Sequence, residues 1–284
     1  MSAIHDRAML VDLHVSQWTA RRYDKRVSKQ ATDNNNATQD AGRFNKALLS
    51  KTALEKITKA VSAIRTYHAE HTLPWGASGS RLLPAVEYFK YMEKMNALQQ
   101  DFNTAVEAFT INYPMYIADA KLRLNTMYKP EDYPPVDEVK YKFGMAVHVG
   151  PVPQDSDFRI DLGDIEVNKI REDMRRRAEA SQRAALGDLW GRMREVVQNM
   201  ATRLANEKST FRNSLVENIS TVVALLPGLN ITNDPALENI RREVEADLCS
   251  LHPDTLRTSP DKRKETAAKA QEIADRMGAF MGTV

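Results

Sequence analysis

The sequence predicts a mostly α-helical protein, with long antiparallel helical hairpins, a helical bundle and a small antiparallel β-sheet. Only 11 of its 284 residues are glycine, and this scarcity favours helix. From about Asp164 to Asn206 the chain contains no proline, and apolar residues recur every three or four positions, as on one face of a long helix. We expect other helices to pack along this stripe. The stripe comprises Ile170, Met174, Ala178, Ala185, Leu189, Met193, Val196, Met200 and Leu204.

A helical hairpin is predicted upstream of this long helix. Apolar residues have helical spacing from Arg43 to about His71 and again from about Leu83 to Tyr113, where they form a heptad seam. The stretch between them, Thr72 to Arg81, is rich in Pro and Gly and predicts a turn. Pro114 is expected to interrupt the second helix. The seam comprises Tyr88, Tyr91, Met95, Leu98, Phe102, Ala105 and Phe109.

Start and stop signals predict three further helices after the long one. The first has apolar residues from Phe211 to Leu226 and is closed by Pro227-Gly228. The other two begin at Asp234-Pro235 and at Ser259-Pro260, where a capping residue precedes a proline in the first turn. The C-terminal part of the chain is therefore expected to be entirely helical.

Three short segments alternate apolar and polar residues, as half-buried strands do: Leu10 to Gln17, Lys142 to Val149 and Asp157 to Leu162. The last two flank a turn and predict a β-hairpin from Phe143 to Leu162. If the first strand pairs with this hairpin, one sheet face carries histidines and charged groups. That face is compatible with acid–base chemistry or cation binding, but an ordinary solvated sheet face produces the same residues and is the favoured interpretation. Its residues are Asp12, His14, His148, Arg159 and Asp161.

A domain boundary is expected where the strands give way to the long helix. It divides the chain into residues 1–163 and residues 164–284, and one continuous elongated domain is the alternative. The net charge is +2, from 40 basic and 38 acidic residues, so no global field selects nucleic acid or membrane. The single cysteine, Cys249, excludes an internal disulfide framework and fits a reducing compartment. No signal peptide or bilayer-length apolar run occurs, and we expect a cytoplasmic protein.

One basic group is a candidate nucleic-acid site. It follows Trp18, contains a single acid, Asp24, and combines positive charge with an aromatic residue, as single-strand binders do. A second basic cluster on the long helix is interleaved with acids, which is typical of a solvated helix with internal ion pairs. The first group comprises Arg21, Arg22, Lys25 and Arg26.

The turn between the first two helices is a candidate interaction loop, comprising Trp75, Gly76, Gly79 and Arg81. It lacks the Gly-Lys-Ser/Thr ending of a phosphate-binding loop, so the chain is not expected to be an ATPase. His68 continues an apolar stripe, which favours a packed histidine over a metal ligand shared with His71. No nucleophile motif is present. We therefore expect no catalytic residues, no cofactor and no metal.

Several stretches together resemble an uncharacterised family of phage and prophage proteins, a domain of unknown function, over nearly the whole chain. Members are often encoded beside a MoxR- or CobS-like AAA+ ATPase and a CobT-like von Willebrand A-type protein. The resemblance implies a non-enzymatic phage accessory protein that acts through protein–protein contacts, as adaptor or scaffold of such an ATPase system. A single-stranded nucleic-acid-binding protein of phage replication or recombination is the alternative, and homo-oligomerisation through the seam stays open. The stretches are Ala41 to Leu49, His71 to Trp75, Arg81 to Pro84, Asp157 to Asp161 and Lys264 to Ala267.

Overall fold

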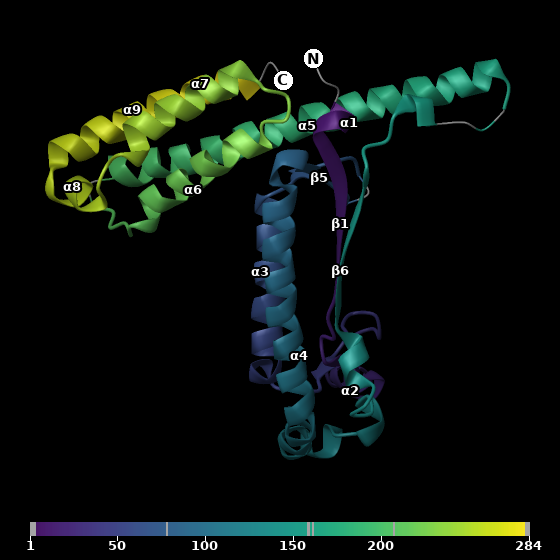
Figure 1. Ribbon diagram of the computed structural model, residues 1–284. Helices are drawn as coiled ribbons and strands as arrows, with labels where there is room; N and C mark the ends of the chain where they lie inside the picture. The colour runs from purple at the N-terminus through teal and green to yellow at the C-terminus, as the bar shows by residue number, and fades with distance from the viewer. Residues whose placement is uncertain (1–3, 78, 158–159, 161, 207, 282–284) are drawn as a thin grey trace. The chain divides into compact units, whose positions relative to one another are not determined.

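The structure is a computed structural model that describes residues 4–77, 79–157, 160, 162–206 and 208–281 (Figure 1). It confirms a mostly helical fold with a small antiparallel sheet. The chain forms two compact units: unit 1 contains residues 1–12, 69–91 and 148–284, and unit 2 contains residues 13–68 and 92–147. The boundary expected after residue 163 lies inside unit 1, and that division stays a prediction.

The sheet has four strands in the order β4-β5-β1-β6. Strand β1 (Ala8–Ser16) confirms the N-terminal strand and pairs antiparallel with β5 (Arg81–Pro84). Strand β4 (Leu73–Pro74) pairs antiparallel with the other edge of β5, and β6 (Gly144–Pro151) follows β1 in the order. Strand β4 therefore lies in the stretch that was expected to be only a turn, and β5 begins at its last residue, Arg81, and continues to Pro84, where the second helix was expected to have begun.

The expected second strand of the hairpin is not formed by its described residues. Asp157 ends a 3₁₀ turn, and neither Ile160 nor Leu162 is in a strand; Phe158, Arg159 and Asp161 lie outside the described residues. The side chains of Ile160 and Leu162 are exposed, so the burial that stabilises one face of a strand is missing. Strands β4 and β5 bury Leu73, Leu82 and Leu83 instead.

Unit 1 is built on α5 (Asp164–Ala205), which confirms the predicted long helix. Helices α6 (Ser214–Leu229), α7 (Pro235–Val244), α8 (Pro253–Thr258) and α9 (Pro260–Met281) follow it. The short α1 (Ile4–Arg7) precedes the sheet, and both α6 and α9 pack against α5 (Figure 1). As predicted, Asp234 caps α7: its carboxylate accepts the amide protons of Ala236 and Leu237.

The predicted stripe of α5 is buried only in its C-terminal half. Leu189, Met193, Met200 and Leu204 are buried against the other helices, whereas Ile170, Met174 and Ala178 are only partly covered. Val197 occupies the inner position expected for Val196. One end of the helix therefore stabilises the bundle, and the other keeps apolar atoms near solvent.

Arg263 of α9 closes the C-terminal end of α5. Its Nε donates to the carbonyl oxygen of Leu204 at 2.9 Å, and its Nη2 donates to those of Arg203, Asn206 and Ser209 at 3.2, 2.6 and 2.9 Å. The last carbonyls of a helix have no partner within the helix and carry partial negative charge. A guanidinium placed there satisfies them and holds α9 to α5.

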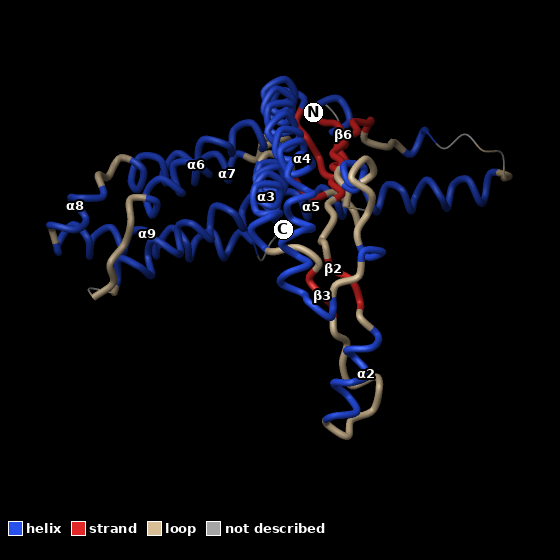
Figure 2. Tube along the Cα trace, turned by 90° about the horizontal axis from the view of Figure 1, so that it is seen from below, coloured by secondary structure: helices blue, strands red, loops and turns tan. Residues whose placement is uncertain are grey.

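Unit 2 contains most of the predicted helical hairpin, α3 (Glu55–Glu70) and α4 (Tyr88–Leu124), which run side by side (Figures 1 and 2). Four apolar residues of the predicted seam are buried: Met95, Leu98, Phe102 and Phe109. Pro114 does not end α4, which corrects that expectation. A proline removes one intrahelical hydrogen bond, and buried residues on both sides of it keep the helix packed: Tyr113, Ala120 and Leu124.

The segment before α3 differs from the expected helix. Helix α3 begins at Glu55, after a 3₁₀ turn at Lys51–Leu54, and not at Arg43. Upstream of it, β3 (Asn45–Ala47) pairs antiparallel with β2 (Arg21–Tyr23), and α2 (Lys25–Asn34) lies between them in sequence (Figure 2). Part of the basic stretch is therefore helical. No helix among the described residues is long and apolar enough to cross a membrane.

Candidate functional site

Unit 2 has a hollow of about 510 Å³ that is lined mainly by charged side chains. It brings together six cationic and three acidic groups, an excess of three positive charges, and we call it the basic hollow. The residues come from β2, α2, β3 and the 3₁₀ turn Pro130–Asp132, together with Asp24 and Lys129, which precede α2 and the turn. The cations are Arg22, Lys25, Arg26, Lys29, Lys46 and Lys129, and the acids are Asp24, Glu131 and Asp132.

Asp24 starts the helix that carries three of these cations. Its backbone N–H donates to the carbonyl of Phe44 at 3.0 Å, and its carboxylate accepts the Val27 N–H at 3.1 Å as the N-cap of α2. That backbone hydrogen bond is the main cause that lowers the pKa of Asp24, and the charges of Lys46 and Lys129 lower it further against the opposing effect of burial. The cap places the first turn of α2 at the hollow.

A buried ion network forms the base of the hollow. The Nζ of Lys46, which is 2% exposed, lies 2.5 Å from Asp132 Oδ2 and 3.7 Å from Asp24 Oδ2. It also donates to the carbonyl of Met127 at 2.7 Å. Arg22 pairs with the second oxygen of Asp132 at 3.2 Å and donates to the Glu131 carbonyl at 3.1 Å. Because a buried charge is stable only when paired and hydrogen-bonded, this network ties three distant segments together.

Four cations of the hollow make no hydrogen bond or ion pair with the network among the described residues, although the charge of Lys129 acts on Asp24. Lys25, Arg26, Lys29 and Lys129 are exposed, and no hydrogen bond or ion pair of their side chains is found within the described part of the chain. Their charges are therefore available to an anion. Because they surround a concave surface, a ligand with several negative groups can reach more than one of them at once.

The structure brings together three of the four basic residues singled out in the sequence. Arg22, Lys25 and Arg26 line the hollow, whereas Arg21 is exposed on β2 and does not. Lys46 and Lys129 were missed because they lie far away in sequence, although Lys46 bonds to the carbonyl of a residue 81 positions later. Only the three-dimensional fold joins them.

The candidate interaction loop connects β4 and β5. Trp75 is buried, and its backbone N–H donates to the carbonyl of Ser80 at 3.2 Å. Gly76 and Gly79 have φ of +61° and +87°, values that disfavour other residues, so the glycines serve the turn. Whether the loop contacts a partner stays a prediction.

Arg81 of this loop is committed to backbone carbonyls together with Arg192 of α5. Arg81 donates to Thr72 Oγ1 at 2.6 Å and to the carbonyl of Thr72 at 2.9 Å, and Arg192 donates to the carbonyls of Ala69, Glu70 and Thr72 at 2.9, 2.7 and 2.8 Å. Burial, followed by the neighbouring charge of Arg192, lowers the pKa of Arg81. These two guanidiniums stabilise the chain where α3 ends.

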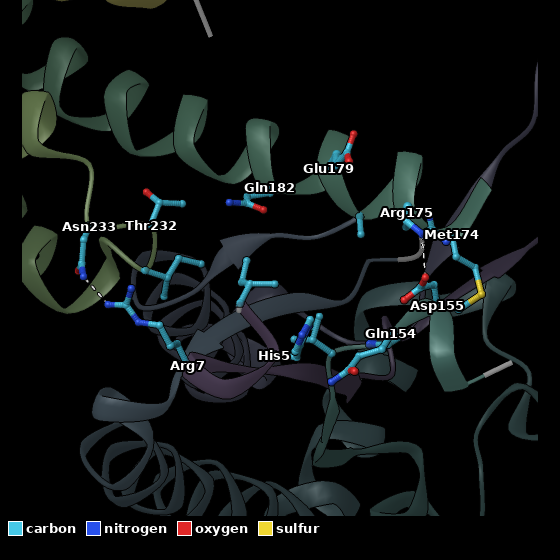
Figure 3. A pocket seen from close by; sticks show the side chains of 15 residues that line it. His5, Arg7, Gln154, Asp155, Met174, Arg175, Glu179, Gln182, Thr232 and Asn233 are labelled. Carbon is cyan, nitrogen blue, oxygen red and sulfur yellow. Dashed lines mark hydrogen bonds and ion pairs between the residues drawn. The ribbon is translucent and has the colours of Figure 1, made fainter. Parts of the chain in front are cut away.

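Unit 1 has a further cleft of about 620 Å³ beside the N-terminal half of α5 (Figure 3). Arg7 donates to Asn233 Oδ1 at 2.8 Å at one end, and Arg175 pairs with Asp155 at 2.7 Å at the other. The hydrogen bond from Arg175 is the main cause that lowers the pKa of Asp155. Because these arginines already have partners, the cleft is a weaker anion site than the basic hollow.

The histidines singled out in the sequence differ in their exposure. His68 is buried, as expected of a packed histidine, and His14 and His148 are exposed, while Arg159 and Asp161 lie outside the described residues. No cluster of three or more His, Cys, Asp or Glu side chains that could hold a metal ion occurs in the described ranges. Burial raises the pKa of Cys249, which keeps this thiol protonated at neutral pH.

Comparison of the chain with protein-family models, with curated proteins and with solved structures found no match.

Proposed function

We propose that this chain is a non-enzymatic binding protein whose basic hollow holds the phosphates of a single-stranded nucleic acid. The observation that carries the proposal is the group of four uncommitted cations, Lys25, Arg26, Lys29 and Lys129, around a buried ion network. The network absorbs Arg22, Lys46 and both aspartates, so it leaves the outer cations free to bind. A single strand is flexible enough to bring successive phosphates into a concave surface.

Binding is expected to weaken steeply with salt. If the four free cations each contact one phosphate, the logarithm of the association constant falls against the logarithm of salt concentration with a slope of about −3. Affinity for a labelled single-stranded oligonucleotide then drops roughly 50-fold between about 50 and about 200 mM salt. Fluorescence anisotropy titrations at several salt concentrations measure this slope.

A matched pair of double variants tests where the phosphates bind. Lys25→Ala with Arg26→Ala removes two hollow cations and is expected to reduce the slope by about 1.4. Lys56→Ala with Lys59→Ala removes two exposed charges from α3, outside the hollow, and is expected to leave the slope unchanged. Equal losses in both variants contradict a localised site.

A second candidate function is that of a phage accessory protein in the host cytoplasm, acting as adaptor or scaffold of an AAA+ ATPase or of a von Willebrand A-type protein. The observation in its favour is a second apolar stripe on α4, at spacings of four, three and four residues, that faces solvent. It comprises Ile111, Met115, Ala118 and Leu122, and the first and last are 79% and 84% exposed. Such a stripe suits a partner helix or a second copy of the chain.

Size-exclusion chromatography of the chain with a MoxR- or CobS-like AAA+ ATPase tests the adaptor function. We expect co-elution and a change in ATP turnover, both lost when Ile111 and Leu122 are replaced by serine. Because both side chains are exposed, this double variant is expected to stay folded. Separate elution together with unchanged turnover contradicts the adaptor function, and a larger species formed by the chain alone points to self-association.

A further inference from the structure

An exposed aromatic side chain lies at the edge of the basic hollow. Tyr23 is the last residue of β2, lines the hollow and is 49% exposed. Its backbone is fixed by pairing with Asn45 of β3, and the next residue, Asp24, is anchored to the Phe44 carbonyl and to α2. A large aromatic ring left half open to water on a fixed backbone is positioned to receive a flat ligand.

Arg43 lies over the ring of Tyr23. The carbon at the centre of its guanidinium is 6.0 Å from the ring centroid. Direct stacking contact has a separation of about 3.5–4.0 Å, so the two groups are not in close contact. A planar base between them requires about 7 Å, twice that separation. Because Arg43 is exposed, a displacement of about 1 Å opens sufficient space.

We propose that Tyr23 and Arg43 sandwich one unpaired nucleobase while the hollow holds the adjacent phosphates. The inference rests on the proposed function and adds a contact that distinguishes single strands from duplexes. Phosphate contacts alone do not identify a single strand, because single strands and duplexes both present phosphate groups. Bases of a duplex are already stacked and paired, so only a single strand presents a base to Tyr23.

Substitutions of Tyr23 separate stacking from charge. Tyr23→Ala is expected to weaken binding of a single-stranded oligonucleotide about 5-fold or more, and Tyr23→Phe, which keeps the ring, to change it less than about 2-fold. Binding of inorganic polyphosphate, which has charges but no bases, is expected to be the same for both variants and the unchanged protein. Fluorescence anisotropy measures oligonucleotide binding directly and polyphosphate binding by competition.

Phe44→Ala supplies the matched control. Phe44 is a neighbouring exposed aromatic residue that does not line the basic hollow, so its removal is expected to leave oligonucleotide affinity unchanged. An equal loss for Tyr23→Ala and Phe44→Ala overturns the sandwich, as does a loss of polyphosphate binding in Tyr23→Ala. Circular dichroism confirms that each variant is folded.

The two proposals fail in different ways. If neither oligonucleotide nor polyphosphate binds the unchanged protein, the basic hollow is not a phosphate site and the proposed function is wrong. If both bind but duplex binds as tightly as single strand and Tyr23→Ala has no effect, the hollow binds phosphate and only the base sandwich is wrong.

Discussion

Replacing Lys46 with methionine is expected to destabilise unit 2 by about 3–5 kcal/mol. The variant keeps the length of the side chain and removes its charge, which leaves Asp24 and Asp132 at a buried position without their shared cation. It also removes the hydrogen bond to the Met127 carbonyl. Removing one partner of a buried ion network lowers the free energy of unfolding by more than an exposed ion pair contributes to it, because the remaining charges stay desolvated. Urea unfolding measures the loss in the free energy of unfolding. Hydrogen exchange of peptides from β2 and β3 shows whether the loss lies in unit 2.

The effect of Lys46→Met is expected to depend on pH. The pKa of Asp24 is lowered in the folded protein, first by the Val27 N–H and then by Lys46. Asp24 therefore contributes stability above its unfolded pKa of about 3.9, and this contribution is lost as pH falls through the lower folded pKa. In the variant, protonation of Asp24 removes one of the unpaired charges, so the stability difference from the unchanged protein is expected to shrink below about pH 4.

Lys59→Met is the control for Lys46→Met. Lys59 pairs with Glu55 at 2.7 Å on the exposed surface of α3, where solvent screens the attraction, and no measurable change is expected. If both lysine variants unfold at the same urea concentration as the unchanged protein, the buried network around Lys46 contributes nothing to unit 2.

Local signals predicted the starts of α7 and α9 well, whereas α6 continues through Pro227-Gly228, which were expected to close it, to Leu229. The caps at Asp234 and Ser259 act over one helical turn, and the apolar period of α5 is a property of consecutive residues. Both remain visible whatever the rest of the chain does. Burial along α5 was less predictable, because the neighbours that cover Leu189 and Met193 do not extend to Ile170.

The sheet was predicted less accurately, because a strand depends on partners that the pattern does not identify. Alternation from Asp157 to Leu162 indicated a strand, yet Ile160 and Leu162 have no apolar cover. Strands β4 and β5 have only two and four residues, too few for a period of two to be recognised. Their burial identifies them only once the chain is folded.

The basic hollow was predicted in part for the same reason. Its contiguous cations, Arg22, Lys25 and Arg26, stand out in the sequence, because few acids dilute them. Lys46 and Lys129 are isolated in sequence and acquire meaning only through Asp132, which the fold brings to Lys46. The charge pattern of the sequence therefore indicated where the basic hollow lies. Tertiary contacts determined its concave shape and which of its cations lack an ion-pair partner among the described residues.

Trp190→Ala is expected to destabilise unit 1 by about 3–5 kcal/mol. Trp190 of α5 is 1% exposed and is among the largest fully buried side chains. Its removal opens a cavity within the apolar cluster formed by α5, α6, α7 and α9. It also removes the hydrogen bond from the indole Nε1 to Asp234 Oδ2, 3.3 Å away. Thermal and urea unfolding monitored by far-ultraviolet circular dichroism measure the change.

Trp190→Phe separates the cavity from the hydrogen bond. Phenylalanine fills most of the space and has no N–H donor, so a loss of only about 1–2 kcal/mol is expected. Because Asp234 also caps α7 through Ala236 and Leu237, part of that loss should disappear when Asp234 is already alanine, with a coupling of about 0.5–1 kcal/mol. Strictly additive losses exclude support of the α7 cap by Trp190. A coupling shows that α5 stabilises the start of α7 through this indole as well as by packing.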